Sequence, residues 1–157
     1  LLYKIRELSF GLRTPDFNIE FFDDALHDMI DRVENRSSIR VVYLPGKRTP
    51  DQSPDIYGHL YRILQECLNN AVRHAGSSRV FVEIQEENGS VYFEYRDDGR
   101  GFDVETAMKE GRLGLRGIRN RVSLCGGSSE IESIPGKGTV LRCRLPLKKS
   151  SGGEDFE

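Results

Sequence analysis

The sequence predicts an α/β fold in a single domain of 157 residues. Two observations favour this class over an all-helical or an all-β one. Residues 60–75 place apolar side chains at the i, i+3, i+4 and i+7 spacing of an amphipathic helix. Asn88-Gly89 separates two runs rich in β-branched and aromatic residues, and both residues tolerate the positive φ of a tight hairpin turn. A long helix and a strand hairpin in one chain indicate a mixed fold.

The first third of the chain is predicted to contain two helices, one strand and one loop. Residues 1–12 carry leucine and isoleucine at helical spacing, and residues 19–36 form a second amphipathic pattern. Residues 38–44 (SIRVVYL) are typical of a short strand. The polar segment 47–54 (KRTPDQSP) is predicted to be a loop.

The remaining elements are predicted in the order helix, two strands, helix, two strands. Between the middle strands and the last helix lies a glycine-rich loop that contains a short polar segment. The polar C-terminal residues are expected to form a disordered tail. The predicted ranges are 55–75 (helix), 79–86 and 90–97 (strands), 98–114 (loop), 115–125 (helix), 129–134 and 138–146 (strands), and 148–157 (tail).

Composition excludes several classes of function. The chain is 37% hydrophobic and 31% charged with a net charge of −2, so bulk electrostatic binding to nucleic acid or to an anionic membrane is not expected. No apolar run approaches the roughly 18 residues that a membrane span needs. Cys67, Cys125 and Cys143 lack metal-ligand spacing and lie in apolar patterns, which predicts reduced, buried thiols in a cytoplasmic protein.

A row of polar side chains follows the predicted helix 55–75. At about 100° per residue, Glu66, Asn70, Arg73 and His74 cluster on the shoulder of the apolar face. An acid, an amide and two cations are suited to holding a metal and phosphates, and Mg²⁺ takes only one or two protein oxygens. A solvated helix side is the competing interpretation, although Asn is a poor former of helix interiors.

Strand periodicity directs two further polar side chains inward. In VYFEYRDDGRGF (91–102), Asp97 is in phase with the apolar positions of its strand, whereas Asp98 is out of phase. An inward carboxylate needs a hydrogen-bond donor, either a ligand's amino group or a backbone cap. Thr139 has the same inward phase in the last strand, where a β-branched residue is also unremarkable. A turn-initiating aspartate is the alternative for Asp97.

Glycines precede the predicted helix 115–125. Gly111 and Gly114 lie just before it, and N–H groups at a helix N-terminus favour phosphate. Nearby arginines add positive charge, although exposed arginines commonly serve solubility. Two other glycine patterns are not interpreted as nucleotide-binding motifs. GKGT (136–139) precedes a strand, whereas a phosphate-binding loop precedes a helix, and GRGF (99–102) lacks a dinucleotide-binding βαβ unit.

Together, four segments resemble the catalytic and ATP-binding domain of bacterial sensor histidine kinases, members of the GHKL ATPase superfamily. The likeness covers about residues 18–147, and it is closest to the branch that works with helix-turn-helix response regulators. It implies a Bergerat-type two-layer α/β sandwich, with a mixed, mostly antiparallel sheet covered on one face by helices. The segments are QECLNNAVRHA (65–75), DDGRGF (97–102), GRLGLRGIRNRV (111–122) and GGSSEIESIPGKGTVLRCRLPL (126–147).

The resemblance implies a role for each candidate residue. Asp97 would accept a hydrogen bond from the adenine amino group, with Thr139 nearby through water. Asn70 would be the magnesium ligand, and Arg73 and His74 would approach the phosphates of ATP. The other implied roles are backbone approach to the base (Gly99, Gly101), phosphate binding at the start of a helix (Gly114, Leu115, Arg116), orientation of water or metal in catalysis (Glu66) and a mobile lid (102–113).

Such domains transfer the γ-phosphoryl group of ATP to a histidine on dimerisation helices and thereby serve a response regulator. Residues 1–14 would be the stub of the last dimerisation helix, 15–147 the catalytic domain and 148–157 a tail, so the phosphoacceptor would lie upstream of this fragment. His27 lies downstream of the stub and is expected to be a helix-surface residue. The alternatives are a serine kinase acting on an anti-sigma partner and a docking module that binds no nucleotide.

Overall fold

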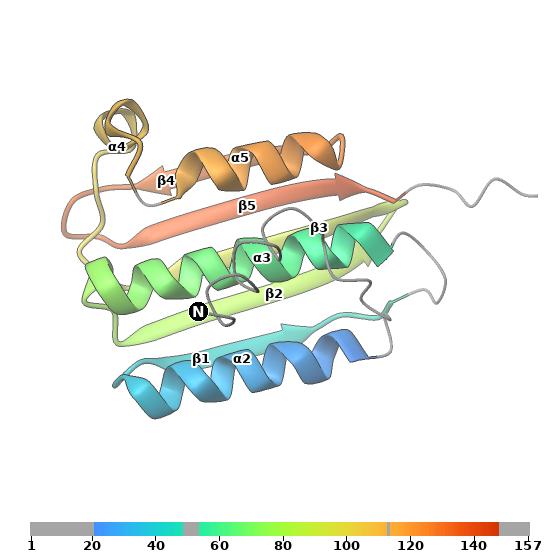
Figure 1. The fold of residues 1–157 in the computed structure, drawn as a ribbon, viewed down its shortest axis with the longest axis horizontal. Coiled ribbons are helices and arrows are strands. Elements are labelled where there is room, and N and C mark those ends of the chain that lie inside the picture. The colour runs from blue at the N-terminus through green and yellow to red at the C-terminus, as the bar shows by residue number, and fades with distance from the viewer. Residues whose placement is uncertain (1–20, 49–53, 113, 148–157) are drawn as a thin grey trace, which may run out of the picture.

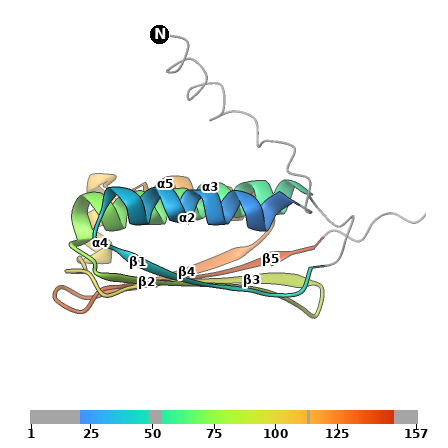
Figure 2. The ribbon, with the colours of Figure 1, turned by 90° about the horizontal axis from the view of Figure 1, so that it is seen from below.

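The structure is a computed structural model that describes residues 21–48, 54–112 and 114–147. It confirms the α/β class, because one open sheet of five strands has helices packed on one face (Figures 1 and 2). The predicted helix at 1–12 and the predicted tail at 148–157 lie outside the described residues. Within the described part, the predicted elements are present with boundaries shifted by a few residues.

The helices form one layer and the strands form the other (Figure 2). A single π-helical turn, η2, continues α3. The helical elements are α2 (Phe22–Arg36), α3 (Pro54–Asn70), η2 (Ala71–Ala75), α4 (Val104–Glu110) and α5 (Leu115–Leu124). The strands are β1 (Arg40–Pro45), β2 (Arg79–Glu87), β3 (Ser90–Asp97), β4 (Ser128–Ser133) and β5 (Thr139–Pro146).

The strands are arranged in the order β1-β2-β3-β5-β4. β1 pairs with β2 in parallel, and the other three pairs are antiparallel, so the sheet is mixed and mostly antiparallel. Asn88 (φ 50°) and Gly89 (φ 72°) form the predicted two-residue turn between β2 and β3. This register places Asp97, at the end of β3, opposite Thr139, at the start of β5.

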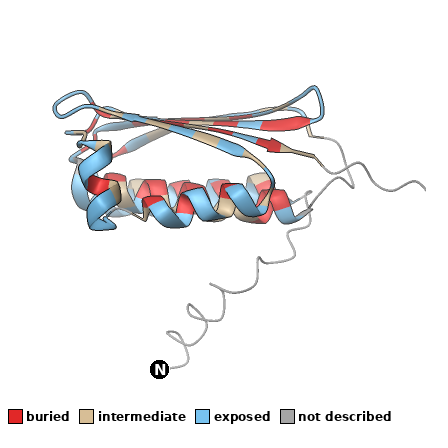
Figure 3. Cartoon of the chain, turned by 90° about the horizontal axis from the view of Figure 1, so that it is seen from above, coloured by how far each residue is buried: buried red, intermediate tan, exposed pale blue. Residues whose placement is uncertain are grey.

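The hydrophobic core lies between the two layers (Figure 3). α3 lies over the middle of the sheet, as Figure 1 shows, and it buries one complete face. Each fully buried large apolar side chain contributes about 1.5–3 kcal/mol to folding. The least exposed apolar or aromatic side chains of α3, β2 and β3 are Tyr57, Leu60, Ile63, Leu64, Leu68, Val80, Val82, Ile84, Val91, Phe93 and Tyr95.

The edge strand β1 has two positions at which its outer N–H groups are not available for pairing. The N–H of Val41 donates to Oε1 of Glu34 over 2.8 Å, and Pro45 has no N–H to offer. A charged side chain and a proline at a sheet edge both discourage pairing with another strand. β1 therefore ends the sheet on this side.

The three cysteines are free thiols, as the sequence predicts. Cys67 and Cys143 are buried, and Cys125 is half-buried. Burial raises the pKa of Cys67 well above its usual value and raises the pKa of Cys143 to about 12. Cys67 and Cys143 therefore remain protonated and weakly nucleophilic at neutral pH.

The predicted polar loop at 47–54 is described only in part, because residues 49–53 lie outside the described residues and Pro54 begins α3. In its described part, Arg48 packs against the core. Its side chain is only 8% exposed, and its guanidinium stacks 4.5 Å from the ring centre of Phe22 and 5.4 Å from that of Tyr57. Cation–π contacts of this kind strengthen as water is removed. Arg48 therefore packs on the core from a segment that looks hydrophilic in the sequence.

The charge of Arg48 is balanced within the same cluster. Arg48 forms an ion pair with Asp23 and donates to Oη of Tyr43 over 2.6 Å, and that hydroxyl in turn donates to Oδ1 of Asp23 over 2.6 Å. Burial opposes ionisation of Asp23, but the hydrogen bonds from Arg48 and Tyr43 outweigh it and hold its pKa below 3.8. The ionised carboxylate of Asp23 therefore stabilises the folded state at neutral pH, and this stabilisation is lost as the pH falls through the lowered pKa of Asp23.

Two local features were not predicted. The segment between β3 and α5 contains a short helix, α4, which the sequence analysis assigned to a loop. The Oδ1 of Asp103 caps its first turn by accepting from the N–H of Thr106 over 2.8 Å, and Gly111 (φ 65°) ends it. In addition, the π-helical turn 71–75 breaks the regular 100° spacing used for the row on α3, so the wheel angles do not apply beyond Asn70.

Candidate nucleotide-binding site

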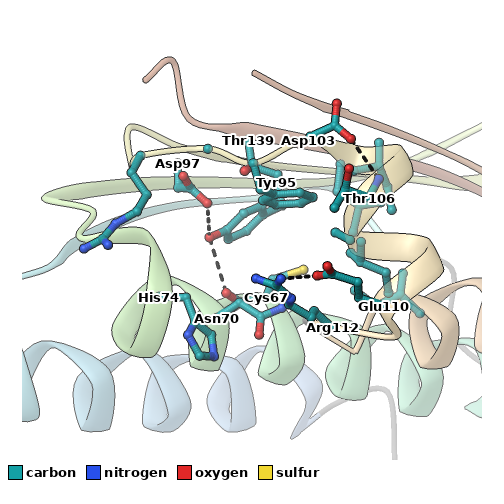
Figure 4. Close-up of a pocket in the computed structure, with 18 residues that line it drawn as sticks. Cys67, Asn70, His74, Tyr95, Asp97, Asp103, Thr106, Glu110, Arg112 and Thr139 are labelled. Atoms are coloured by element: carbon teal, nitrogen blue, oxygen red, sulfur yellow. Dashed lines mark hydrogen bonds and ion pairs between the residues drawn. The ribbon is translucent and has the colours of Figure 1, made fainter. Parts of the chain in front are cut away.

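A cavity of about 590 Å³ opens between the helical layer and one end of the sheet. Figure 4 shows side chains from α3, β3, β5 and α4 converging on it. Its size suits a small ligand, and its wall combines apolar and polar groups. The apolar lining residues include Phe102, Leu115, Ile118, Ile131 and Leu141, and the polar ones include Asn70, His74, Asp97, Arg100, Arg112 and Thr139.

Asp97 lies at the end of β3, where the strand opens into the cavity. Its Oδ1 accepts from the N–H of Gly99 over 2.9 Å, and its Oδ2 accepts from the hydroxyl of Tyr95 over 2.8 Å. A carboxylate has about four lone-pair sites, so it retains acceptor capacity on the cavity side. The two protein donors fix its direction before a ligand enters.

Asp98 has a different, structural role. Its Oδ1 accepts from the N–H groups of Ser78 (2.8 Å) and Arg79 (2.9 Å), and its Oδ2 accepts from Oγ of Ser78 (2.5 Å). These bonds, with that from Oγ of Ser78 the strongest, lower the pKa of Asp98. The carboxylate therefore anchors the start of β2 and does not line the cavity.

Thr139 belongs to a small hydroxyl network beside Asp97. Its Oγ1 lies 2.9 Å from Oγ of Ser133, which also donates to the carbonyl of Gly138 (3.0 Å) and accepts from the N–H of Phe102 (2.9 Å). The network ties the loop after β3 to both strands of the β4–β5 hairpin. It thereby holds Thr139 on the cavity wall.

Two glycines bring main chains together under the cavity. A Cβ on Gly101 (φ 62°) would collide with the carbonyl oxygen of Ile134, and a Cβ on Gly138 (φ 82°) would collide with the carbonyl oxygen of Asp97. Neither collision can be relieved by rotating a side chain. Gly101, predicted to let the backbone pass close to the base, does line the cavity, and the contact that demands a glycine there is with the β4–β5 turn. Gly138 was not predicted as a site residue.

The polar row of α3 reaches the cavity only in part. Asn70, half-buried at the end of α3, and His74, in η2, both line it. Arg73 is exposed and does not line the cavity. A π-turn inserted in a helix changes the direction of the side chains that follow, and such turns are common at functional sites.

Glu66 lies behind the cavity wall. Its carboxylate packs so closely on Gly114 (φ 62°), the residue before α5, that a Cβ at Gly114 would collide with Oε1. Leu115, the first residue of α5, is buried and does line the cavity. Gly99 and Arg116 do not line the cavity. The N–H of Gly99 donates to Asp97, and the guanidinium of Arg116 donates to the carbonyl of Met108 over 3.5 Å.

α4 and the residues after it form one wall of the cavity (Figure 4). Thr106 and Glu110 come from α4, and Arg112 follows it and forms an ion pair with Glu110. Phe102, Thr106 and Glu110 belong to the segment predicted to be a lid (102–113), whereas Tyr95 was not predicted to line the cavity. An aspartate three residues before Thr106, with a glycine after the polar stretch, is a capping pattern that could have indicated this helix.

Residues 21–48, 54–112 and 114–147 contain no group of three or more His, Cys, Asp or Glu side chains that could hold a metal ion. A Mg²⁺ ion that accompanies a nucleotide needs only one or two protein oxygens, because water and phosphate complete its octahedron. The amide of Asn70 on the cavity wall fits that requirement.

The two-layer sandwich and its cavity, with a carboxylate at the end of a strand, define an α/β domain with a site for a small ligand. The chain belongs to the histidine kinase-, DNA gyrase B-, and HSP90-like ATPase family, whose model matches residues 56–149. The match begins at the start of α3 and runs through β5, so it contains the whole cavity. The domain therefore has the fold of an ATP-using family.

Three curated relatives that the chain resembles are sensor proteins or sensor-like kinases by name. An uncharacterized sensor-like histidine kinase of Chloroflexus aurantiacus is 29% identical over 93% of this chain and 26% of its own length. The sensor protein VraS of Staphylococcus aureus is 26% identical over 97% of this chain and 43% of its own length. The sensor histidine kinase LiaS of Bacillus subtilis is 28% identical over 97% and 41%. The chain spans less than half the length of these relatives.

Solved structures agree on the fold. The histidine kinase domain of a blue-light activated histidine kinase from Erythrobacter litoralis superimposes with a TM-score of 0.59 and 28% identity, covering 76% of this chain and 57% of that one. The ATP binding domain of PrrB from Mycobacterium tuberculosis gives a TM-score of 0.59 at 24% identity, covering 78% and 93%. In the part of this chain that the structure describes, no helix is both long and apolar enough to cross a membrane.

Proposed function

We propose that this domain binds Mg²⁺-ATP and transfers the γ-phosphoryl group to a histidine on dimerisation helices of its parent protein. The observation that carries the proposal is that Asn70 and Asp97, which come from different layers, line one cavity within the matched family region. In the transfer, the bond between the γ-phosphorus and its bridging oxygen breaks, a bond from phosphorus to an imidazole nitrogen forms, and ADP leaves. The protein supplies positioning and charge neutralisation.

The proposed purine subsite is the region around Asp97. A carboxylate that keeps free lone pairs can accept from the amino group of adenine. Thr139 lies opposite Asp97 in the β3–β5 register and lines the cavity, and we propose that it acts through water. Apolar side chains such as Ile131 and Leu141 provide flat contact for a base.

The proposed phosphate subsite lies between Asn70 and the start of α5. Magnesium bound by Asn70 would neutralise part of the triphosphate charge. His74 and Leu115 line the cavity there, and the N-terminus of α5 favours anions. Arg73, Gly114 and Arg116 do not line the cavity, so we assign them to this subsite from the family resemblance. Glu66 contacts Gly114, and we propose that it orients water or metal there.

The partners proposed are the parent's own dimerisation helices and a response regulator. The parent would carry residues 1–14 as the end of the last dimerisation helix, and residues 15–147 as the catalytic domain, with a cytoplasmic location. The relatives support this arrangement, because they are sensor proteins of greater length.

Two measurements test the proposal. Mg²⁺-ATP should raise the melting temperature, because a ligand at about 100 times its Kd stabilises the folded state by about 2.7 kcal/mol. Mixing the domain with the parent's dimerisation helices and labelled ATP should yield acid-labile phosphohistidine. Acid-stable phosphoserine on a partner would support the serine kinase alternative instead. No thermal shift at millimolar nucleotide would support the docking module.

Asn70→Ala is expected to remove the magnesium dependence of nucleotide binding. Wild-type protein should bind ATP more tightly with Mg²⁺ than with EDTA, and the variant should bind it equally weakly in both, because the proposed oxygen ligand is gone. Isothermal titration calorimetry measures the ratio. Asn69→Ala is the matched control, since Asn69 is the exposed neighbour in the same helix. A variant that keeps the full magnesium effect would contradict this assignment.

A further inference from the structure

Tyr95 has an unusual position on the core-facing side of β3. It is only 2% exposed and lines the cavity with its hydroxyl group, which points toward Asp97 (Figure 4). The two preceding residues on the same side of the strand, Val91 and Phe93, are purely apolar. A buried hydroxyl costs free energy unless it finds a hydrogen-bond partner, so the oxygen of Tyr95 has to be accounted for.

The hydroxyl of Tyr95 has two acceptors within reach and a single proton. Oδ2 of Asp97 lies 2.8 Å away, and the carbonyl oxygen of Cys67 in α3 lies 3.4 Å away. The shorter contact is to a carboxylate, and hydrogen bonds to a charged acceptor are the stronger kind. Burial, together with the nearby Cys67 and Asp97, raises the pKa of Tyr95 well above its usual value, so the group stays protonated and can donate.

We propose that Tyr95 is a positioning residue for base recognition: its hydroxyl fixes the carboxylate of Asp97 in the direction that receives the amino group of adenine. This inference rests on the proposed function. The hydroxyl of Tyr95 donates to Oδ2 and the N–H of Gly99 donates to Oδ1. These two hydrogen bonds fix the rotation of the Asp97 carboxylate before a ligand binds. A group held in its binding orientation does not lose conformational freedom on binding, which increases affinity.

The same hydroxyl also lies between the two layers at the cavity. The carbonyl of Cys67 belongs to α3, which contributes Asn70 one turn later, whereas Asp97 belongs to the sheet. Tyr95 therefore lies where the proposed purine and magnesium subsites adjoin. An apolar residue at this position could fill the core but could not orient the carboxylate.

The test compares Tyr95→Phe with Tyr92→Phe. Both substitutions remove one hydroxyl from β3, but Tyr92 is 38% exposed and its hydroxyl accepts from Arg144 instead of facing the cavity. Calorimetry is run with Mg²⁺-ADP and with Mg²⁺-IDP, in which a carbonyl replaces the amino group of adenine. We expect Tyr95→Phe to weaken ADP binding by about fivefold, the usual size of one lost hydrogen bond. IDP binding should change less than twofold, and Tyr92→Phe should change neither.

A second arm uses the Asp97→Asn background, in which Tyr95→Phe should have no further effect on ADP affinity, because residues acting through one contact are not additive. Equal losses for ADP and IDP would overturn the inference, since they would indicate general packing. A Tyr95→Phe protein that binds ADP like wild type, or that loses its fold, would also overturn it. If wild-type protein binds neither nucleotide, the proposed function fails instead, which distinguishes the two failures.

Discussion

Asp97→Asn should reduce the affinity for Mg²⁺-ATP by at least about 100-fold, because a site built to accept a hydrogen bond loses much of its affinity when its buried polar groups are left mismatched. The side chain keeps its shape, but one oxygen becomes an NH₂ group. At Oδ1 that group would face the N–H of Gly99, which is another donor, and at Oδ2 it would force the hydroxyl of Tyr95 to accept and to donate instead to the carbonyl of Cys67, 3.4 Å away. The neutral amide also lacks the charge that strengthens a hydrogen bond from the amino group of the base. Isothermal titration calorimetry at fixed Mg²⁺ measures the loss.

Asp98→Asn is the matched control for this experiment. Asp98 is the next residue, and its carboxylate anchors Ser78 and Arg79 at the start of β2 outside the cavity. Its replacement should lower the midpoint of urea unfolding and leave ATP affinity within about twofold, since hydrogen bonds away from the ligand affect the fold more than the site. If Asp97→Asn binds ATP within tenfold of wild type, the purine subsite is wrongly assigned.

Arg48→Met should destabilise the fold by about 2 kcal/mol, because it removes the buried member of an ion pair, whose partner Asp23 is 40% exposed, and the cation that stacks on two rings. The ring of Phe22 would lose the guanidinium above it, and Asp23 would keep only the hydrogen bond from Tyr43. The variant should also lose less stability than wild type on acidification below about pH 4, since Arg48 helps to lower the pKa of Asp23. Urea unfolding at pH 7 and at pH 3.5 measures both effects.

Arg40→Met provides the comparison for Arg48. Arg40 lies 3.8 Å from Glu34, and its side chain is 79% exposed. An exposed ion pair contributes about 0–1 kcal/mol, so the same substitution there should be nearly silent. Equal effects of the two substitutions would show that burial of Arg48 does not matter to stability. A drop of less than about 1 kcal/mol for Arg48→Met would lead to the same conclusion.

Features with local signals were predictable from the sequence. α3 was found because its apolar residues repeat at helical spacing, and the β2–β3 hairpin was found because Asn88-Gly89 accepts positive φ. Strand phase also directed Asp97 and Thr139 inward, and the structure places both on the cavity wall with Asn70. The roles of these three residues toward a nucleotide stay predictions.

Features that depend on distant residues were not predictable in this way. Arg48 lies in a polar stretch, and its burial follows from rings that Phe22 and Tyr57 supply from other elements. Tyr95 has the phase of a core residue, so its pattern gives no indication of a hydroxyl that binds Asp97. α4 buries only Ala107, and one buried residue gives no periodicity.

The close main-chain contacts at Gly101 and Gly138 limit which substitutions these two positions can accept. The atoms that exclude a side chain are main-chain oxygens of Ile134 and Asp97, which every residue type carries. An alanine at either glycine therefore cannot be rescued by shrinking a neighbour, as it can when two side chains collide. In a search for suppressors of Gly101→Ala, reversion should be the dominant outcome, and compensating changes at position 134 should be missing.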